Sequence, residues 1–148
     1  MEIAAPDEDP VVRSLRGIIS YTRWPATPFP LRLCVVGETP HLEAILAGVR
    51  LPGRAVTARQ IAPDPVAVRD CDVLYFGGAT GALAAGISQP GMLTVSEQDA
   101  ACRGGGMFCL RVQPGRVSFQ LNLDAVARSG LRIDPKVLIM GRGMGGLQ

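Results

Sequence analysis

The sequence predicts a single layered α/β domain with a mixed, mainly parallel sheet, helices on both faces and an antiparallel hairpin at one edge. Two apolar runs, at residues 31–36 and 71–76, are continuous enough to be strands buried on both faces, which is typical of parallel sheets. Segments with apolar residues at helical spacing alternate with strand-like runs. Later in the chain, two further strand-like runs flank a Pro-Gly turn, which predicts the hairpin.

The first predicted helix begins at Pro10, directly behind Asp9. A carboxylate at the N-cap and proline at the first helical position both favour a helix start there. Apolar side chains recur along one face of this segment until Pro25, which ends the helix. The buried strand over residues 31–37 follows. A second helix is predicted to open at Thr39-Pro40, with apolar residues at helical spacing from Leu42 to Val49.

The middle of the chain is predicted to continue this alternation. A weaker strand covers residues 56–61, and a linking segment at 63–70 has room for one helical turn. The second strongly buried strand covers residues 71–76. Residues 77–91 contain five glycines, which predicts a loose loop with only a poor helix, and a short strand follows over 92–95.

The last third of the chain combines a hairpin with two helices. Ser96 followed three residues later by Asp99 resembles a capping box, which predicts a brief helix at that point. A β-hairpin is predicted over residues 107–121. A helix over 122–130 has asparagine as its N-cap and glycine at its C-terminal end, and a final helix is predicted over 137–140.

Domain limits follow from the two ends of the sequence. Residues 1–9 are predicted to be a flexible leader, 10–141 a single domain and 142–148 a flexible glycine-rich tail. The 148 residues, 47% of them hydrophobic, are enough to bury one core. A net charge of +2 with interspersed signs gives no footprint for nucleic acid, and no apolar run is long enough to span a membrane.

Two features could carry small-molecule chemistry. The loop Gly77–Gly81 follows a buried strand and could cradle an anion, although a simple strand-to-helix loop is the favoured interpretation. His41 is the only histidine, which excludes a multi-histidine metal site, and we interpret it as a surface residue. No acid–base constellation or metal-ligand spacing is evident, so no catalytic residue, metal ligand or cofactor site is predicted.

The four cysteines permit three disulfide pairings. Cys34 and Cys71 are on two buried strands that a doubly wound sheet would make neighbours. Cys102 and Cys109 flank a triple-glycine turn that could bring them together. Four reduced cysteines that fill a cytosolic core remain the alternative, and no C-x-x-C motif points to zinc or to thioredoxin-type chemistry.

Some apolar residues are candidates for a partner-binding surface. Tyr21 and Trp24 are interpreted first as helix-end anchors, and alternatively as contacts for another protein, because amphipathic aromatics are enriched at interfaces. The first and last helices carry more apolar residues than one narrow core-facing stripe needs, which predicts a homodimer built on them. These residues are Ile18, Ile19, Val137 and Leu138.

Five sequence blocks occur in an order that is typical of one family. They are Tyr21–Pro25 with the spelling Tyr-Thr-Arg-Trp-Pro, Leu33–Gly37, Cys71–Tyr75, Gly104–Met107 and Val117–Ala125. In this order they resemble the YfiR-like family of bacterial periplasmic regulators, over most of the chain.

The resemblance implies a dimeric periplasmic α/β domain without enzymatic activity. Such proteins restrain a membrane-bound diguanylate cyclase by binding its periplasmic part, which lowers cyclic di-GMP and biofilm formation, and an outer-membrane-associated partner can sequester them. It also implies the pairings Cys34–Cys71 and Cys102–Cys109 in an oxidising compartment. The competing hypothesis is a small cytosolic α/β domain that binds a nucleotide or other small ligand at Gly77–Gly81.

Overall fold

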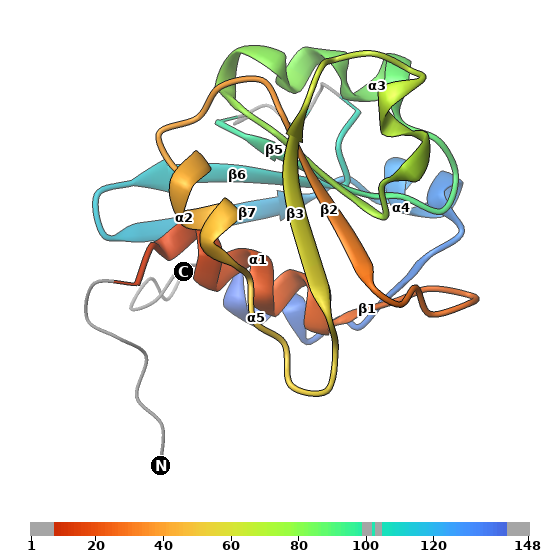
Figure 1. Ribbon diagram of the computed structural model, residues 1–148. Coiled ribbons are helices and arrows are strands. Elements are labelled where there is room, and N and C mark those ends of the chain that lie inside the picture. The colour runs from red at the N-terminus through yellow and green to blue at the C-terminus, as the bar shows by residue number, and fades with distance from the viewer. Residues whose placement is uncertain (1–7, 99–101, 103–104, 142–148) are drawn as a thin grey trace.

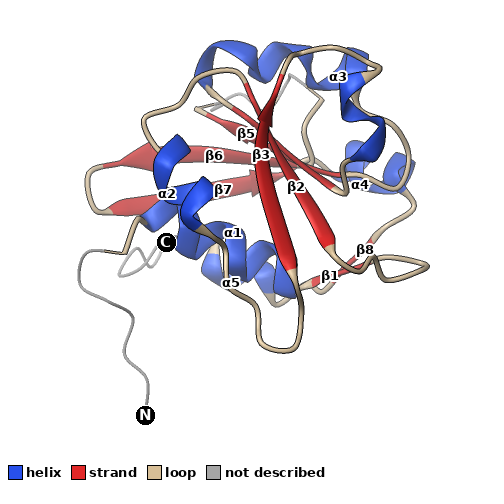
Figure 2. Cartoon of the chain, viewed as in Figure 1, coloured by secondary structure: helices blue, strands red, loops and turns tan. Residues whose placement is uncertain are grey.

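A six-stranded sheet lies at the centre of the molecule and carries helices on both faces (Figure 1, Figure 2). The computed structural model describes residues 8–98, 102 and 105–141. The strands are β1 (Thr22–Arg23), β2 (Leu31–Val36), β3 (Val56–Ile61), β4 (Val73–Phe76), β5 (Leu93–Glu97), β6 (Phe108–Gln113), β7 (Arg116–Leu121) and β8 (Arg132–Ile133). The α-helices are α1 (Pro10–Ser20), α2 (Leu42–Ala47), α3 (Ala84–Ile87), α4 (Leu123–Ser129) and α5 (Val137–Met140), and η1 (Ala67–Asp70) and η2 (Gly78–Leu83) are 3-10 helices.

The strand order is β3-β2-β4-β5-β6-β7, parallel except for the antiparallel pair β6–β7 at one edge. The predicted mixed, mainly parallel sheet with an edge hairpin is therefore confirmed. The chain leaves β2 for β3 on one side and then returns to β4 on the other side. This reversal makes the carboxyl ends of β2 and β4 the topological switch point, where ligands bind in many open α/β sheets.

Alternate residues of the central strands face two separate hydrophobic layers. Leu33 and Val35 of β2 pack against α1, α2 and α5, together with Tyr75 of β4. Cys34 and Val36 face the other way, toward η1 and α3. Both layers are buried, so these strands read as continuous apolar runs in the sequence instead of alternating. Helices therefore cover both faces, as predicted.

Local capping signals place two helix ends where the sequence predicts them. Asp9 Oδ1 accepts a hydrogen bond of 2.7 Å from the N–H of Val11 at the start of α1. Asn122 Oδ1 accepts one of 3.1 Å from the N–H of Ala125 at the start of α4. Gly130 ends α4 with φ 77°, a left-handed conformation that glycine adopts without strain.

Two local predictions differ from the structure. Ser96 does not begin a helix, because it is fully buried in β5 and lies opposite Phe76 of β4. Pairing within the sheet outweighs the local capping preference, and Asp99, the other half of the predicted box, lies outside the described residues. The two-residue strands β1 and β8 were not predicted either, because two residues carry no periodic pattern.

The described residues before α1 contact the domain. Glu8 forms an ion pair with Arg16, one of the residues of α1. Asp9 caps α1 and also contacts His41. The rest of the predicted leader, residues 1–7, and the predicted tail, residues 142–148, lie outside the described residues.

Candidate functional site

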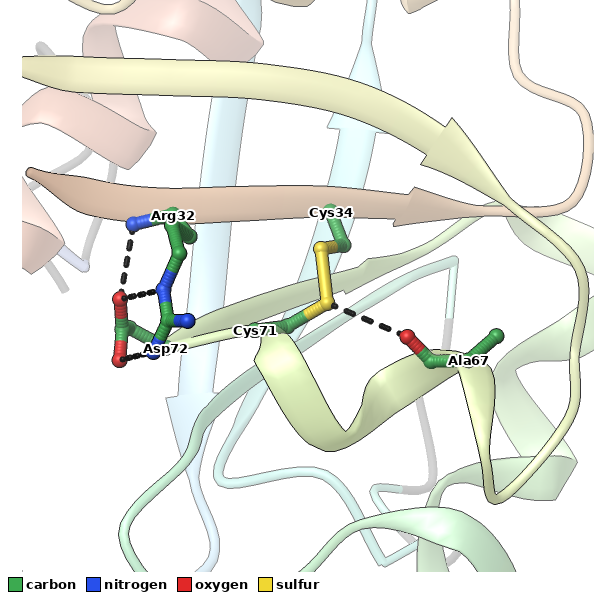
Figure 3. The surroundings of a disulfide bond; sticks show 5 residues. All are labelled: Arg32, Cys34, Ala67, Cys71 and Asp72. Carbon is green, nitrogen blue, oxygen red and sulfur yellow. Dashed lines mark hydrogen bonds and ion pairs between the residues drawn. A yellow bond between two sulfur atoms is a disulfide. The ribbon is translucent and has the colours of Figure 1, made fainter.

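A disulfide links the two central strands on the face covered by η1 and α3. Cys34 lies within β2 and is fully buried, and Cys71 lies two residues before the start of β4 (Figure 3). Their Cα atoms are 5.9 Å apart although 37 residues separate them in sequence. The neighbouring parallel strands β2 and β4 bring the two residues together, as the two buried strands in the sequence predict.

An ion pair reinforces the same two strands beside this disulfide. Asp72 Oδ2 accepts hydrogen bonds from the backbone N–H of Arg32 at 2.8 Å and from its Nε at 3.1 Å, and Oδ1 accepts one from Nη2 at 3.2 Å (Figure 3). The hydrogen bond to Asp72 raises the pKa of the Arg32 guanidinium. Arg32 therefore stays charged. These hydrogen bonds between Arg32 and Asp72, the Arg32–Asp72 fork, join β2 to β4 at their N-terminal ends.

A second disulfide closes a short loop at β6, next to the edge strand β7. Cys109 lies in β6 and pairs with Cys102, seven residues earlier, at a Cα–Cα distance of 5.3 Å. By loop entropy alone this short closure contributes about 2.5 kcal/mol, against about 4 kcal/mol for the longer one. Both pairings that the resemblance implied are present.

Mass spectrometry tests these disulfides in protein purified from the cells that naturally produce it. We expect the purified protein to gain about four hydrogens on reduction, because each disulfide takes up two electrons and two protons. Non-reducing peptide mapping should give Cys34 with Cys71 and Cys102 with Cys109. Free thiols, or a crossed pairing, would contradict the structure.

A buried carboxylate lies at the switch point of the sheet. Glu97 ends β5, its side chain is 4% exposed, and three donors surround it. Its Oε2 accepts hydrogen bonds from the hydroxyls of Tyr75, at 2.8 Å, and Thr39, at 2.6 Å. Its Oε1 accepts one of 2.9 Å from the N–H of Gly78. The carboxylate therefore joins the loops that follow β2 and β4.

His41 connects this carboxylate to the start of α1. Its Nδ1 lies 2.7 Å from Asp9 Oδ2, and its Nε2 lies 3.9 Å from Glu97 Oε2. The histidine side chain is 19% exposed, so the interpretation of His41 as a plain surface residue is wrong. The sequence hides this because Asp9 and Glu97 are distant from His41 along the chain. Its role in the structure is to hold neighbouring elements together.

The Tyr75 hydroxyl is a fixed hydrogen-bond donor. Burial, together with the negative charge of Glu97, raises the pKa of this phenol well above its ordinary value of 10.0. The hydroxyl therefore stays protonated and donates to Glu97 at any ordinary pH. It cannot serve as a base near neutrality, because a base must be able to release and take up a proton in that range.

The Gly77–Gly81 loop, for which anion binding is the alternative interpretation, is held by the protein's own groups. The N–H of Gly78 donates to Glu97, and the N–H of Gly77 donates to the carbonyl of Val36 at 2.9 Å. The Thr80 hydroxyl lies 3.0 Å from the same Val36 carbonyl. A Cβ on Gly77 would lie 2.1 Å from the carbonyl oxygen of Glu38, so the loop packs closely on its neighbour. Glu97 fills the position that an anionic ligand would take.

Sequence reasoning missed this cluster. Glu97 is the last residue of the buried strand β5, and Tyr75 is the one polar-tipped side chain of the buried run at residues 73–76. A strand alignment that placed both residues on one face would have suggested a contact. The register that pairs Tyr75 with Val95 comes from the folded sheet and not from local sequence.

The predicted partner-binding residues differ greatly in exposure. Ile18, Ile19 and Val137 are fully buried, so they offer no surface to a partner in this fold. Helix α5 lies against α1, and a Cβ on Gly17 would lie only 2.3 Å from the Met140 sulfur. This close approach covers the part of α1 that looked like surplus apolar surface in the sequence.

Trp24 is an anchor rather than an open contact surface. It is 9% exposed, and its Nε1 donates a hydrogen bond of 3.1 Å to the carbonyl of Gly91. The Arg54 guanidinium lies over the indole ring at 5.4 Å from its centroid. Trp24 and the exposed Phe29 also line a pocket of about 420 Å³. The helix-end anchor interpretation is thus the better one for this residue.

Exposed apolar surface remains on the last helix. Leu138 is 47% exposed and its neighbour Ile139 is 73% exposed. Tyr21 is partly buried and packs against the first hydrophobic layer. Of the six predicted partner-binding residues, Leu138 therefore presents the clearest apolar surface.

Over residues 8–98, 102 and 105–141, no group of three or more histidine, cysteine or acidic side chains is arranged to hold a metal ion. Within the same residues, no helix has the length and apolar character needed to cross a membrane.

Comparison with known protein families shows what the chain resembles. A family model described as YfiR/HmsC-like matches residues 11–142. The matched region begins in the first turn of α1 and covers both disulfides and the Glu97 cluster.

Proposed function

The chain belongs to the YfiR/HmsC-like family, and from this premise we propose that it is a non-catalytic periplasmic protein that binds and represses a membrane-bound diguanylate cyclase. YfiR-like proteins are known as periplasmic regulators rather than catalysts. Binding to the periplasmic part of the cyclase lowers cyclic di-GMP and with it biofilm formation. An outer-membrane-associated protein sequesters the repressor and releases the cyclase.

The observation that carries this proposal is the pair of disulfides within a YfiR/HmsC-like domain. Structural disulfides persist in oxidising compartments such as the periplasm and are rare in the cytosol. The resemblance implied both pairings, and the fold brings both pairs within bonding distance. A cytosolic location would leave these cysteines reduced.

The Glu97 cluster supports a non-catalytic role. Its carboxylate is satisfied by hydrogen bonds from Tyr75, Thr39 and Gly78. A catalytic acid or base must instead be within reach of a substrate proton. The same contacts weigh against the competing hypothesis of a small ligand at Gly77–Gly81, because that ligand would have to displace a buried internal carboxylate.

The exposed apolar surface of α5 is our proposed site for dimerisation. Leu138 and Ile139 are neighbours on a short helix that packs on α1 through its other face. Apolar side chains that remain exposed next to a covered helix face are typical of protein contact sites. The proposed homodimer is thus assembled through Leu138 and Ile139, in place of the buried Ile18, Ile19 and Val137.

Sedimentation tests the dimer. We expect a dimer at about tens of micromolar, a range that suits a moderately tight interface. Leu138→Arg should shift it to monomer, because burying an unpaired charge in an interface is costly. Val66→Arg is the matched control, since Val66 is 63% exposed at a distant position before η1, and it should stay dimeric. A monomeric wild type, or a Leu138→Arg dimer, would refute this interface.

Cyclic di-GMP in cells tests the function itself. In a strain that lacks its own copy of the gene, the level should rise, and expression of the protein with a periplasmic export signal should lower it again. The same chain kept in the cytosol should have no effect. The protein exported to the periplasm should also retain the cyclase in a pull-down from solubilised membranes. An unchanged cyclic di-GMP level after export would overturn the proposal.

A further inference from the structure

A second link between β2 and β4 lies directly beside the Cys34–Cys71 disulfide. Asp72 follows Cys71, and Arg32 precedes Cys34 by two residues, so the fork between Asp72 and Arg32 joins the same two strands (Figure 3). The backbone adds to it, since the N–H of Asp72 donates to the carbonyl of Arg32 at 2.8 Å. None of these contacts involves sulfur. The link can therefore persist when both cysteines are reduced.

The fork is placed where it controls the separation of the two cysteines. Pinning Arg32 to Asp72 fixes the neighbouring residues of each strand as well, and the cysteine Cα atoms lie 5.9 Å apart. Disulfides form only over a narrow range of such distances, near this value. The Asp72 side chain is 11% exposed, and charge-assisted hydrogen bonds of this kind are stronger than neutral ones.

We propose that Asp72 is a positioning residue for the Cys34–Cys71 disulfide. Together with Arg32 it holds the N-terminal ends of β2 and β4 in register while the cysteines are reduced, so that the disulfide re-forms in place. In the reduced protein without the fork, these strand ends separate more often. In the oxidised protein the covalent bond itself prevents the separation, so losing the fork disfavours the oxidised form relative to the reduced form.

The reaction that reports this is exchange with a disulfide oxidant, here glutathione disulfide. The thiolate of one cysteine attacks the oxidant and releases one glutathione, which leaves a mixed disulfide. The thiolate of the other cysteine then attacks the mixed disulfide and releases the second glutathione. Two electrons pass from the cysteine sulfurs to the oxidant, and the two thiol protons end on the released glutathiones. Only the second step depends on the distance between Cys34 and Cys71.

The experiment measures the equilibrium of each disulfide in the full chain. Protein is equilibrated in buffers of defined reduced and oxidised glutathione, quenched in acid, alkylated and mapped by mass spectrometry. We expect Asp72→Ala to lower the equilibrium constant of Cys34–Cys71 by about tenfold, which is the loss of roughly one charge-assisted hydrogen bond. The Cys102–Cys109 pair in the same molecules should not change.

Two further variants make the result specific. Asp72→Asn keeps one acceptor oxygen and should lower the constant less than Asp72→Ala, and it decides the outcome alone if the alanine variant fails to fold. Asp70→Asn is the control, because it also removes a negative charge next to Cys71. Asp70 acts on Arg32 through its charge and not through a hydrogen bond, so this variant should leave the equilibrium constant of Cys34–Cys71 unchanged. Wild-type values for folded Asp72 variants, or an equal fall for Cys102–Cys109, would overturn the proposal.

Discussion

Glu97→Ala is expected to lower the free energy of unfolding by about 3 kcal/mol or more. The substitution removes the acceptor for the hydroxyls of Tyr75 and Thr39 and for the N–H of Gly78. Each buried donor left without a partner costs about 1–3 kcal/mol, and the removed side chain leaves a cavity as well. Urea unfolding, followed by circular dichroism, measures the shift of the midpoint.

Two variants separate this effect from a simple loss of charge. Glu97→Gln keeps one carbonyl oxygen but turns an NH₂ group toward donors, so we expect an intermediate loss. Glu43→Ala removes an exposed carboxylate from the first turn of α2 and should change stability by less than about 0.5 kcal/mol. A loss below about 1 kcal/mol for Glu97→Ala would mean that the cluster is not a structural centre of the domain.

Local signals in the sequence were sufficient for most helix ends and strands. The Asp9-Pro10 pair determines where α1 starts. The N-cap preference of aspartate and the preference of proline for the first helical position both act locally, within one turn of helix. The strand at residues 56–61 agrees with the observed β3 to the residue. The helix predicted at Ser96 failed because residues distant in sequence decide that position, where β4 on one side and β6 on the other complete the hydrogen bonding of β5.

The candidate site depends on such distant contacts and could be predicted only in part. The cysteine pairs followed from the family resemblance, with spacing as support. The Glu97 cluster could not be foreseen, because its donors Thr39, Tyr75 and Gly78 lie far from Glu97 in the sequence. Surface apolar residues were misjudged for a related reason. The width of the apolar stripe on α1 predicted a dimer surface, but α5 of the same chain covers it.

The exposed fraction of each side chain decides which of the predicted partner-binding residues can contact another protein. Leu138 keeps nearly half of its surface, whereas Val137 beside it points into the core. A helix of four residues places adjacent side chains on different faces, so sequence proximity alone cannot distinguish them. Any contact with a partner protein must use exposed residues such as Leu138.

Loss of the longer disulfide is expected to abolish repression, whereas loss of the lone histidine is not. Replacing both Cys34 and Cys71 with alanine removes the 37-residue closure and avoids a lone reactive thiol. By loop entropy the change costs about 4 kcal/mol, a large share of the 5–15 kcal/mol that stabilises a typical domain. We expect repression to fall in step with the amount of folded protein in the periplasm.

His41→Ala is the matched test of the non-catalytic reading. It removes the contact with Asp9, whose Oδ2 lies 2.7 Å from Nδ1, and should cost about 1–2 kcal/mol, which the domain can tolerate. If the protein acts by occupying its partner, this variant should repress the cyclase as well as the wild type does at equal protein level. The readout is cyclic di-GMP in cells that lack their own copy of the gene. The opposite result would be a folded His41→Ala protein that does not repress the cyclase, together with a cysteine variant that represses it fully. That result would show that repression depends on a titratable group and not on the folded surface.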